Sequence, residues 1–163
     1  MSLRIAGAHI CATAILVPVF LNSRAKDRKI IMDRKMARAH AMKLIYEWEM
    51  GGDGGDETRC DLLEIKAGEK EADFMNQMFE GVVAHVDEID EKIKAFAHGW
   101  SIDRITRVDL AILRLGVYEL LLGKVPMGIV INEAVDLANQ YSTEKAGSFI
   151  NGILGNIGRS LSE

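Results

Sequence analysis

The sequence contains few of the residues that build cross-linked or metal-held domains. Only two of its 163 residues are cysteine, and only two are proline. Cys11 and Cys60 lie 49 positions apart, and neither has a second cysteine near it, which excludes a zinc knuckle and a redox CxxC motif. This cysteine usage fits a reduced, cytoplasmic setting best, and a single disulfide between the two cysteines is the alternative.

Strand patterns, internal repeats and common catalytic motifs are also missing from the sequence. No stretch alternates apolar and polar residues as a half-buried strand does, and no repeat with a period of about 20 to 50 residues appears. A glycine-rich phosphate loop, a GxSxG motif and an HExxH motif are all absent. The four histidines are scattered, without carboxylate or cysteine partners at ligand spacing. We therefore expect no enzymatic activity, no metal ion and no cofactor.

The sequence is rich in apolar and helix-forming residues. Apolar residues make up 48% of the chain, and leucine, alanine, methionine, glutamate and lysine dominate its long segments. A chain of 163 residues has the usual size of one domain and is large enough to bury a substantial core. We predict an all-α domain.

The first helices are predicted from apolar spacing and from the residues that begin or end a helix. Asp33 is expected to cap a first helix. Residues 51–60, with four glycines and three acids, are expected to form a flexible loop that ends it. The segment 69–96 keeps helical spacing with a break near Asp87, which predicts one or two further helices.

The second half of the chain predicts three more helices. From residue 105 to residue 122 the sequence is apolar nearly all round, as expected of a helix buried at the centre of a domain. Gly123 and Pro126 should end this helix. Segments 128–142 and 144–161 supply the last two.

Residues 1–31 differ from the rest of the chain. Ile5–Leu21 is an apolar run behind Arg4, typical of a signal-peptide core or a short membrane anchor, but no convincing cleavage site follows it. We therefore divide the chain into two parts. Residues 1–31 form an apolar and basic extension, best explained as non-native or as an upstream start, and residues 32–163 form the helical domain. Packing of the extension on the domain and membrane targeting are the alternatives.

Positive charge is concentrated before and within the first predicted helix. Between Arg24 and Lys43 the local balance is +6, so the rest of a chain with net charge -4 carries -10. Cations in the first turn of a helix oppose its macrodipole at a cost of roughly 0.3 to 1 kcal/mol each, so folding alone would not select them. A helical wheel places three cations and one aromatic residue in one sector: Arg34, Lys35, Arg38 and Tyr46. This sector suits a phosphate backbone with a stacked base, and a solvated charged face is the alternative.

Ordered motifs in the second half of the chain resemble the NusB family of transcription antitermination factors. They are ILRLGVYEL, a VP turn, INEAVDLA and FINGIL. In the first half, RKMARAHAMKLIYEWEM resembles the arginine-rich start of the same family. The resemblance covers about Asp33 to Arg159, and it implies a compact fold of two small packed helical bundles with about seven helices.

The resemblance also implies a function as a non-enzymatic RNA-binding adaptor. NusB-like proteins recognise a boxA-type single-stranded element in ribosomal RNA leader transcripts and pair with the ribosomal protein NusE. They act in the RNA polymerase antitermination complex and suppress termination. The resemblance implies an RNA surface that consists of Arg34, Lys35, Arg38, Tyr46, Asp109 and Phe149. The sequence adds one cation beside this surface, Lys145. The alternative for Phe149 is a buried position in the core.

Two other functions stay open at this point. A NusB-like module also forms the RNA-binding front end of a ribosomal RNA cytosine methyltransferase. Because this chain ends at Glu163, with no room for a catalytic domain, that interpretation requires the chain to be a fragment. A helical adaptor that binds only proteins would make the basic sector incidental. Monomer and homodimer both stay open, since the resembled family is described as both, whereas we expect no membrane partner.

Overall fold

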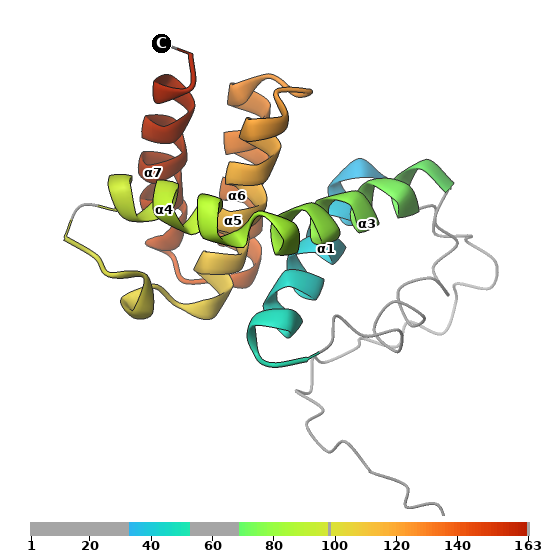
Figure 1. Cartoon of the computed structure of the whole chain (residues 1–163), viewed down its shortest axis with the longest axis horizontal. Helices are drawn as coiled ribbons and strands as arrows, with labels where there is room; N and C mark the ends of the chain where they lie inside the picture. The colour runs from blue at the N-terminus through green and yellow to red at the C-terminus, as the bar shows by residue number, and fades with distance from the viewer. Residues whose placement is uncertain (1–32, 53–68, 98, 163) are drawn as a thin grey trace, which may run out of the picture.

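The computed structural model describes residues 33–52, 69–97 and 99–162 (Figure 1). Within these ranges the chain forms six α-helices, one short 3-10 helix and no strand, which confirms the all-α prediction. The elements are α1 Arg34–Glu49, α3 Glu69–Ala84, α4 Val86–Phe96, η1 Ile102–Arg104, α5 Arg107–Leu122, α6 Met127–Tyr141 and α7 Ala146–Ser160. The predicted N-terminal extension and most of the predicted loop at 51–60 lie outside the described residues.

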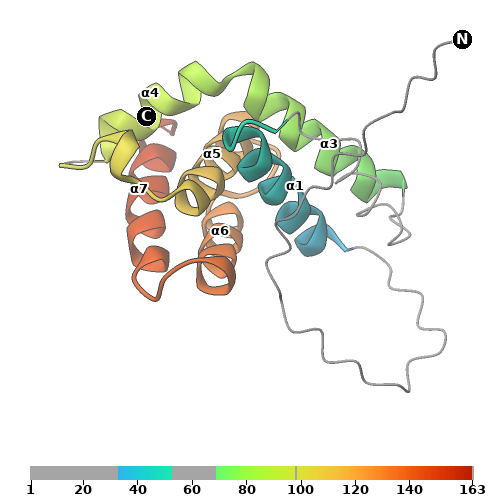
Figure 2. The same ribbon diagram turned by 90° about the horizontal axis from the view of Figure 1, so that it is seen from below.

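Helix α5 lies at the centre of the described structure. It contacts α1, α3, α4, α6 and α7, and every residue from Asp109 to Glu119 is buried. In Figures 1 and 2, α6 and α7 lie side by side, while α1 and α3 pack together on the other side of α5. These two groups are the two predicted bundles, and they share α5 and one hydrophobic core. Of the helices described, none is both long and apolar enough to cross a membrane.

The start of α1 follows from its sequence as predicted. The Asp33 side chain accepts a hydrogen bond from the backbone N–H of Met36 at 2.8 Å, which satisfies one of the donors that a first helical turn leaves free. The predicted apolar face of the helix is buried in the core. Its fully buried members are Ala37, Ala41, Leu44 and Ile45.

The segment that was predicted to hold one or two helices forms two. Helices α3 and α4 separate at His85, so Asp87 lies inside the first turn of α4, where a carboxylate stabilises the helix dipole. Tyr118 of α5 packs against this junction, with its ring centroid 5.7 Å from that of His85. The ring also occupies the space beside Gly81, because a Cβ at that position would lie 2.0 Å from Cζ of Tyr118. Residue 81 must therefore be very small.

The connection between α5 and α6 is built from the two predicted helix breakers. Gly123 ends α5 with a φ of 59°, a left-handed conformation that glycine adopts without strain. Pro126 then precedes the first residue of α6. The chain reverses within this short turn, and α6 packs against α5.

We expect Gly81→Ala to lower the free energy of unfolding by about 1 to 3 kcal/mol, because the added methyl group would overlap the buried ring of Tyr118. Gly152→Ala is the matched control on α7, where nothing lies within 4 Å of the new Cβ. It should be neutral or stabilising by up to about 1 kcal/mol, since alanine favours helix over glycine. Urea unfolding followed by circular dichroism measures both, and equal stabilities would contradict the packing described for Tyr118.

Candidate nucleic-acid interface

An open cavity of about 260 Å³ lies where η1, the start of α5 and the start of α7 meet. Three of the predicted site residues line this cavity together: Asp109, Lys145 and Phe149. Trp100 and Arg104 line it as well. We call this cavity the aromatic pocket.

Two aromatic rings form part of the wall of the aromatic pocket. The centroids of Trp100 and Phe149 lie 5.8 Å apart, and the ring planes meet at 61° in an edge-to-face arrangement. Trp100 is 54% exposed, whereas Phe149 packs on the core while remaining partly exposed. Phe149 is therefore neither a fully buried core residue nor a free surface ring. Exposed aromatic surface of this kind can stack on an unpaired base.

The polar residues of the aromatic pocket include a buried acceptor and two exposed cations. Asp109 is 6% exposed, and its Oδ1 has no hydrogen-bond partner among the described residues. Its backbone N–H donates to Oγ1 of Thr106 at 3.2 Å, the capping bond that begins α5. Lys145 and Arg104 are exposed. A buried acceptor without a partner is costly to leave unsatisfied, so a hydrogen-bond donor of a ligand would be favoured here.

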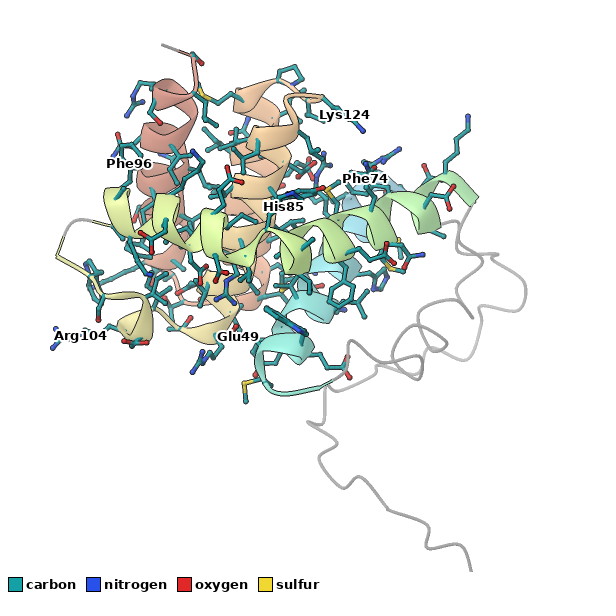
Figure 3. All side chains as sticks on the ribbon, viewed as in Figure 1. Glu49, Phe74, His85, Phe96, Arg104 and Lys124 are labelled. Carbon is teal, nitrogen blue, oxygen red and sulfur yellow. The ribbon has the colours of Figure 1, made fainter. Side chains whose placement is uncertain are left out.

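Trp100 and Arg104 are site residues that the sequence pattern alone did not indicate. They lie in the connection between α4 and α5, and only tertiary packing brings Trp100 beside Phe149 of α7. Figure 3 shows Arg104 near the start of α5, away from Lys124 at its other end. The available signal was the short stretch GWSIDR, in which an aromatic residue and a cation flank a polar turn.

Arg38 is buried, whereas a phosphate contact requires an exposed side chain. Its side chain is 6% exposed, and Nε lies 3.1 and 3.0 Å from the two carboxylate oxygens of Glu119. Nη2 donates to Oε1 of Glu119 at 3.0 Å, and Nη1 lies 3.5 Å from the carboxylate of Glu133. The guanidinium compensates the buried negative charge of Glu119, which gives Arg38 a structural role, and its predicted RNA contact stays a prediction.

Arg34 lies on the same face of α1 as Arg38, because both guanidinium groups lie over the ring of Phe74 on α3 and both line one cavity. The guanidinium carbon of Arg34 lies 4.2 Å from the ring centroid of Phe74 on α3. Nζ of Lys35 instead lies 2.5 Å from the carboxylate of Asp136 on α6, and this hydrogen bond raises the pKa of Lys35. Tyr46 packs partly buried against the core. Arg34 and Arg38 therefore share the face of α1 that meets α3, whereas Lys35 faces α6. The RNA contacts of these residues stay a prediction.

Helix α5 carries a second buried charge, Arg114. Its guanidinium donates two hydrogen bonds to Asp90 at 2.8 Å and another to Glu49, which also pairs with Arg107. Burial opposes the charge of Arg114, but Asp90 and Glu49 hold the pKa of its guanidinium above the ordinary value. Within the parts of the chain that the structure describes, no three side chains of the metal-binding types cluster closely enough to hold a metal ion.

The chain is similar in sequence and fold to known NusB proteins. The sequence model of the NusB family matches residues 35–159. The transcription antitermination protein NusB of Acetivibrio thermocellus is 44% identical over 128 residues, which cover 77% of this chain and 88% of that protein. A structure of T. maritima NusB matches with a TM-score of 0.71 and 30% identity, covering 78% of this chain and 92% of that chain. A crystal structure of the antitermination factors NusB and NusE in complex with double-stranded RNA matches with a TM-score of 0.68 and 35% identity, covering 78% and 96%.

We expect Arg38→Met to lower the free energy of unfolding by about 3 to 5 kcal/mol, because it leaves the carboxylate of Glu119 buried without its partner. The double variant Arg38→Met/Glu119→Leu removes both charges and should recover most of this loss. Denaturant unfolding of the wild type, both single variants and the double variant forms a complete cycle. A stable Arg38→Met variant that has lost only RNA affinity would show that Arg38 serves RNA binding instead.

Proposed function

Because this chain belongs to the NusB family, we propose that it recognises a boxA-type element in ribosomal RNA leader transcripts together with the ribosomal protein NusE. In this proposal it joins the RNA polymerase antitermination complex in the cytoplasm and suppresses termination, and residues 32–163 form its RNA-binding domain. Family membership makes the chain a non-enzymatic antitermination factor. A structural relative in complex with NusE and RNA supports both proposed partners.

The aromatic pocket is the observation that carries the RNA proposal. An unstacked base would pack against Phe149 and Trp100, while Lys145 and Arg104 meet the neighbouring phosphates. Oδ1 of Asp109 would accept a hydrogen bond from an N–H group at the edge of that base. This bond would supply the partner that Oδ1 lacks among the described residues. Aromatic surface, cations and a buried acceptor together are typical of sites that read single-stranded RNA.

The shape of the aromatic pocket favours a single strand over a duplex. The structural relative noted above contains double-stranded RNA. A cavity of about 260 Å³ suits one unstacked base, whereas the bases of a duplex are paired and stacked and cannot reach ring surfaces in a pocket. We therefore assign the sequence-selective contacts of this chain to an unpaired RNA segment.

The proposed RNA surface extends from the aromatic pocket to α1. Arg34 and Lys35 are exposed, and the carboxylates near them, Glu71 and Asp136, lie at the surface where phosphates can replace them as partners. Tyr46 adds a partly exposed ring farther along α1. Arg38 contributes indirectly, because its ion pair with Glu119 fixes α1 against α5.

The alternatives are weaker than the antitermination proposal. The matched relative is named an antitermination protein, which disfavours a methyltransferase module. If the chain were a helical adaptor that binds only proteins, the exposed aromatic and basic side chains of the aromatic pocket would have no function. RNA binding separates this last alternative from the proposal.

We expect Phe149→Leu to weaken binding of a single-stranded boxA-type RNA about tenfold, because stacking of one base on an aromatic ring contributes about 1 to 3 kcal/mol. Lys145→Gln should lower the slope of log affinity against log salt by about 0.7, the value for one lost phosphate contact on a single strand. Fluorescence anisotropy with labelled RNA at several salt concentrations measures both effects.

Matched controls for these variants lie on α4. Phe96 is half-buried and Lys94 is exposed, so Phe96→Leu and Lys94→Gln repeat the same chemical changes away from the aromatic pocket. Both should bind RNA as the wild type does. A scrambled RNA and a duplex of the boxA sequence should bind more weakly than the single strand. Equal affinity of the wild type for all three RNAs would refute selective recognition of boxA.

We expect NusE to tighten binding of the boxA-type RNA at least fivefold. The chain offers few exposed cations near the aromatic pocket and carries a net charge of -4, so its own affinity should be modest at physiological salt. A partner with a basic surface adds phosphate contacts and should also steepen the salt dependence. Titrations with and without NusE measure this effect, and superimposable curves would remove support for joint recognition.

A further inference from the structure

A second cavity, of about 320 Å³, lies between α1 and α6. Its lining includes two lysines, a histidine and a tyrosine, which are Lys35, Lys43, His40 and Tyr141, together with the capping residue Asp33. We call this cavity the α1–α6 groove. Neither His40, Lys43 nor Tyr141 belongs to the RNA surface proposed above.

His40 is a buried polar side chain without a partner. It is 6% exposed, and its Nδ1 has no hydrogen-bond partner among the described residues. Burial, and then the nearby charge of Lys43, lowers the pKa of the imidazole, which favours the neutral form of the ring. A neutral imidazole has one N–H donor and one nitrogen acceptor. Folding alone would favour an apolar residue at this position, because an unsatisfied buried polar group is costly.

A cation and an aromatic ring lie beside His40 in the α1–α6 groove. Nζ of Lys43 is 5.4 Å from the ring centroid of Tyr141, which is partly exposed at the end of α6. Lys43 itself is exposed and has no acidic partner at ion-pair distance among the described residues, whereas Lys35 is held by Asp136. Lys43 is therefore the cation of the groove that is available to an anionic ligand.

The α1–α6 groove and the aromatic pocket meet at the same turn of the chain. Tyr141 is the last residue of α6 and lines the groove, while Thr143 and Lys145, two and four residues later, line the aromatic pocket. A strand that leaves the aromatic pocket past this turn therefore reaches Tyr141 next. Along the groove, Lys35 and Lys43 lie eight residues apart on α1, which corresponds to roughly 12 Å of helix.

We propose that the α1–α6 groove is a second nucleotide-binding subsite of the same RNA surface, separate from the aromatic pocket. Lys43 contacts a backbone phosphate, the ring of Tyr141 stacks on the base, and His40 hydrogen-bonds to the base edge or the ribose. A nucleotide is the ligand that uses all three groups, because it presents an anion, a flat ring and hydrogen-bonding edges together. This inference rests on the proposed RNA-binding function.

Two variants test the proposed subsite, each with its own matched control. Tyr141→Leu removes the ring and should weaken binding of the boxA-type RNA about fivefold, whereas Tyr141→Phe keeps the ring and should bind as the wild type does. Lys43→Gln should lower the log–log salt slope by about 0.7, whereas Lys94→Gln on α4 should leave it unchanged. Anisotropy titrations measure the affinities, and circular dichroism confirms that each variant is folded.

His40→Leu provides a readout that a purely structural residue would not give. The substitution removes an unsatisfied buried group, so it should raise the midpoint of thermal unfolding of the free protein. It should at the same time weaken RNA binding about threefold, because the hydrogen bond to the nucleotide is lost. A variant that is stabilised and binds RNA with unchanged affinity would assign His40 no part in the subsite.

The length of RNA that the protein contacts gives an independent test. We expect RNA shortened by a few nucleotides at one of its two ends to bind more weakly, and this shortened RNA should no longer distinguish Tyr141→Leu from the wild type. Sensitivity to Phe149→Leu should remain with the same RNA, because that residue lies in the aromatic pocket. If Tyr141→Leu weakens binding of RNA shortened at either end as much as it weakens binding of the full-length RNA, the proposed path of the strand is overturned.

The outcomes separate this inference from the proposed function. If the wild type binds boxA RNA and Phe149→Leu weakens binding, but Tyr141→Leu and Lys43→Gln both bind normally, the function stands and the second subsite is refuted. If these two variants weaken binding of NusE while RNA affinity is unchanged, the α1–α6 groove is a protein-binding site, and the inference is equally overturned. Absence of RNA binding by the wild type would refute the proposed function itself.

Discussion

The burial of α5 on all sides is the constraint on which the rest of the structure depends. All five other described α-helices pack against it, yet its buried segment includes Arg114 and Glu119. Removing one partner of a buried ion pair costs about 3 to 5 kcal/mol, so each of these charges requires an opposite charge beside it. Helix α1 supplies both, with Arg38 near its start for Glu119 and Glu49 at its end for Arg114. The two pairs fix α1 along α5 in one register.

The position of α1 in turn decides where its exposed cations lie. With Arg38 directed inward, Arg34 lies against α3, while Lys35 and Lys43 face α6. An acidic protein can bind RNA with such a distribution, because screening at physiological salt limits the repulsion from charges more than about 8 to 10 Å away. The cations beside the aromatic pocket and the α1–α6 groove therefore matter more to a bound strand than the net charge of the chain.

Local features of the fold could be predicted from the sequence, and long-range pairs could not. The cap at Asp33 and the ends of α5 depend on residues within a few positions of each other, so their signals are visible in the sequence. The partner of Arg38 lies 81 positions away, and a helical wheel of α1 cannot show it. The resemblance implied two residues of the aromatic pocket, Asp109 and Phe149, and the sequence added Lys145. It did not predict Trp100, whose role depends on its approach to Phe149.

The buried cation Arg38 and the exposed cations of this protein respond differently to ionic strength. Salt weakens interactions of exposed charges strongly and those of buried pairs much less. The pair between Arg38 and Glu119 is shielded from solvent, whereas Lys43 and Lys145 are not. Concentrated salt should therefore strip nucleic acid from this protein during purification while the packing of α1 on α5 stays intact, and dilution should restore a fully competent molecule without any refolding step.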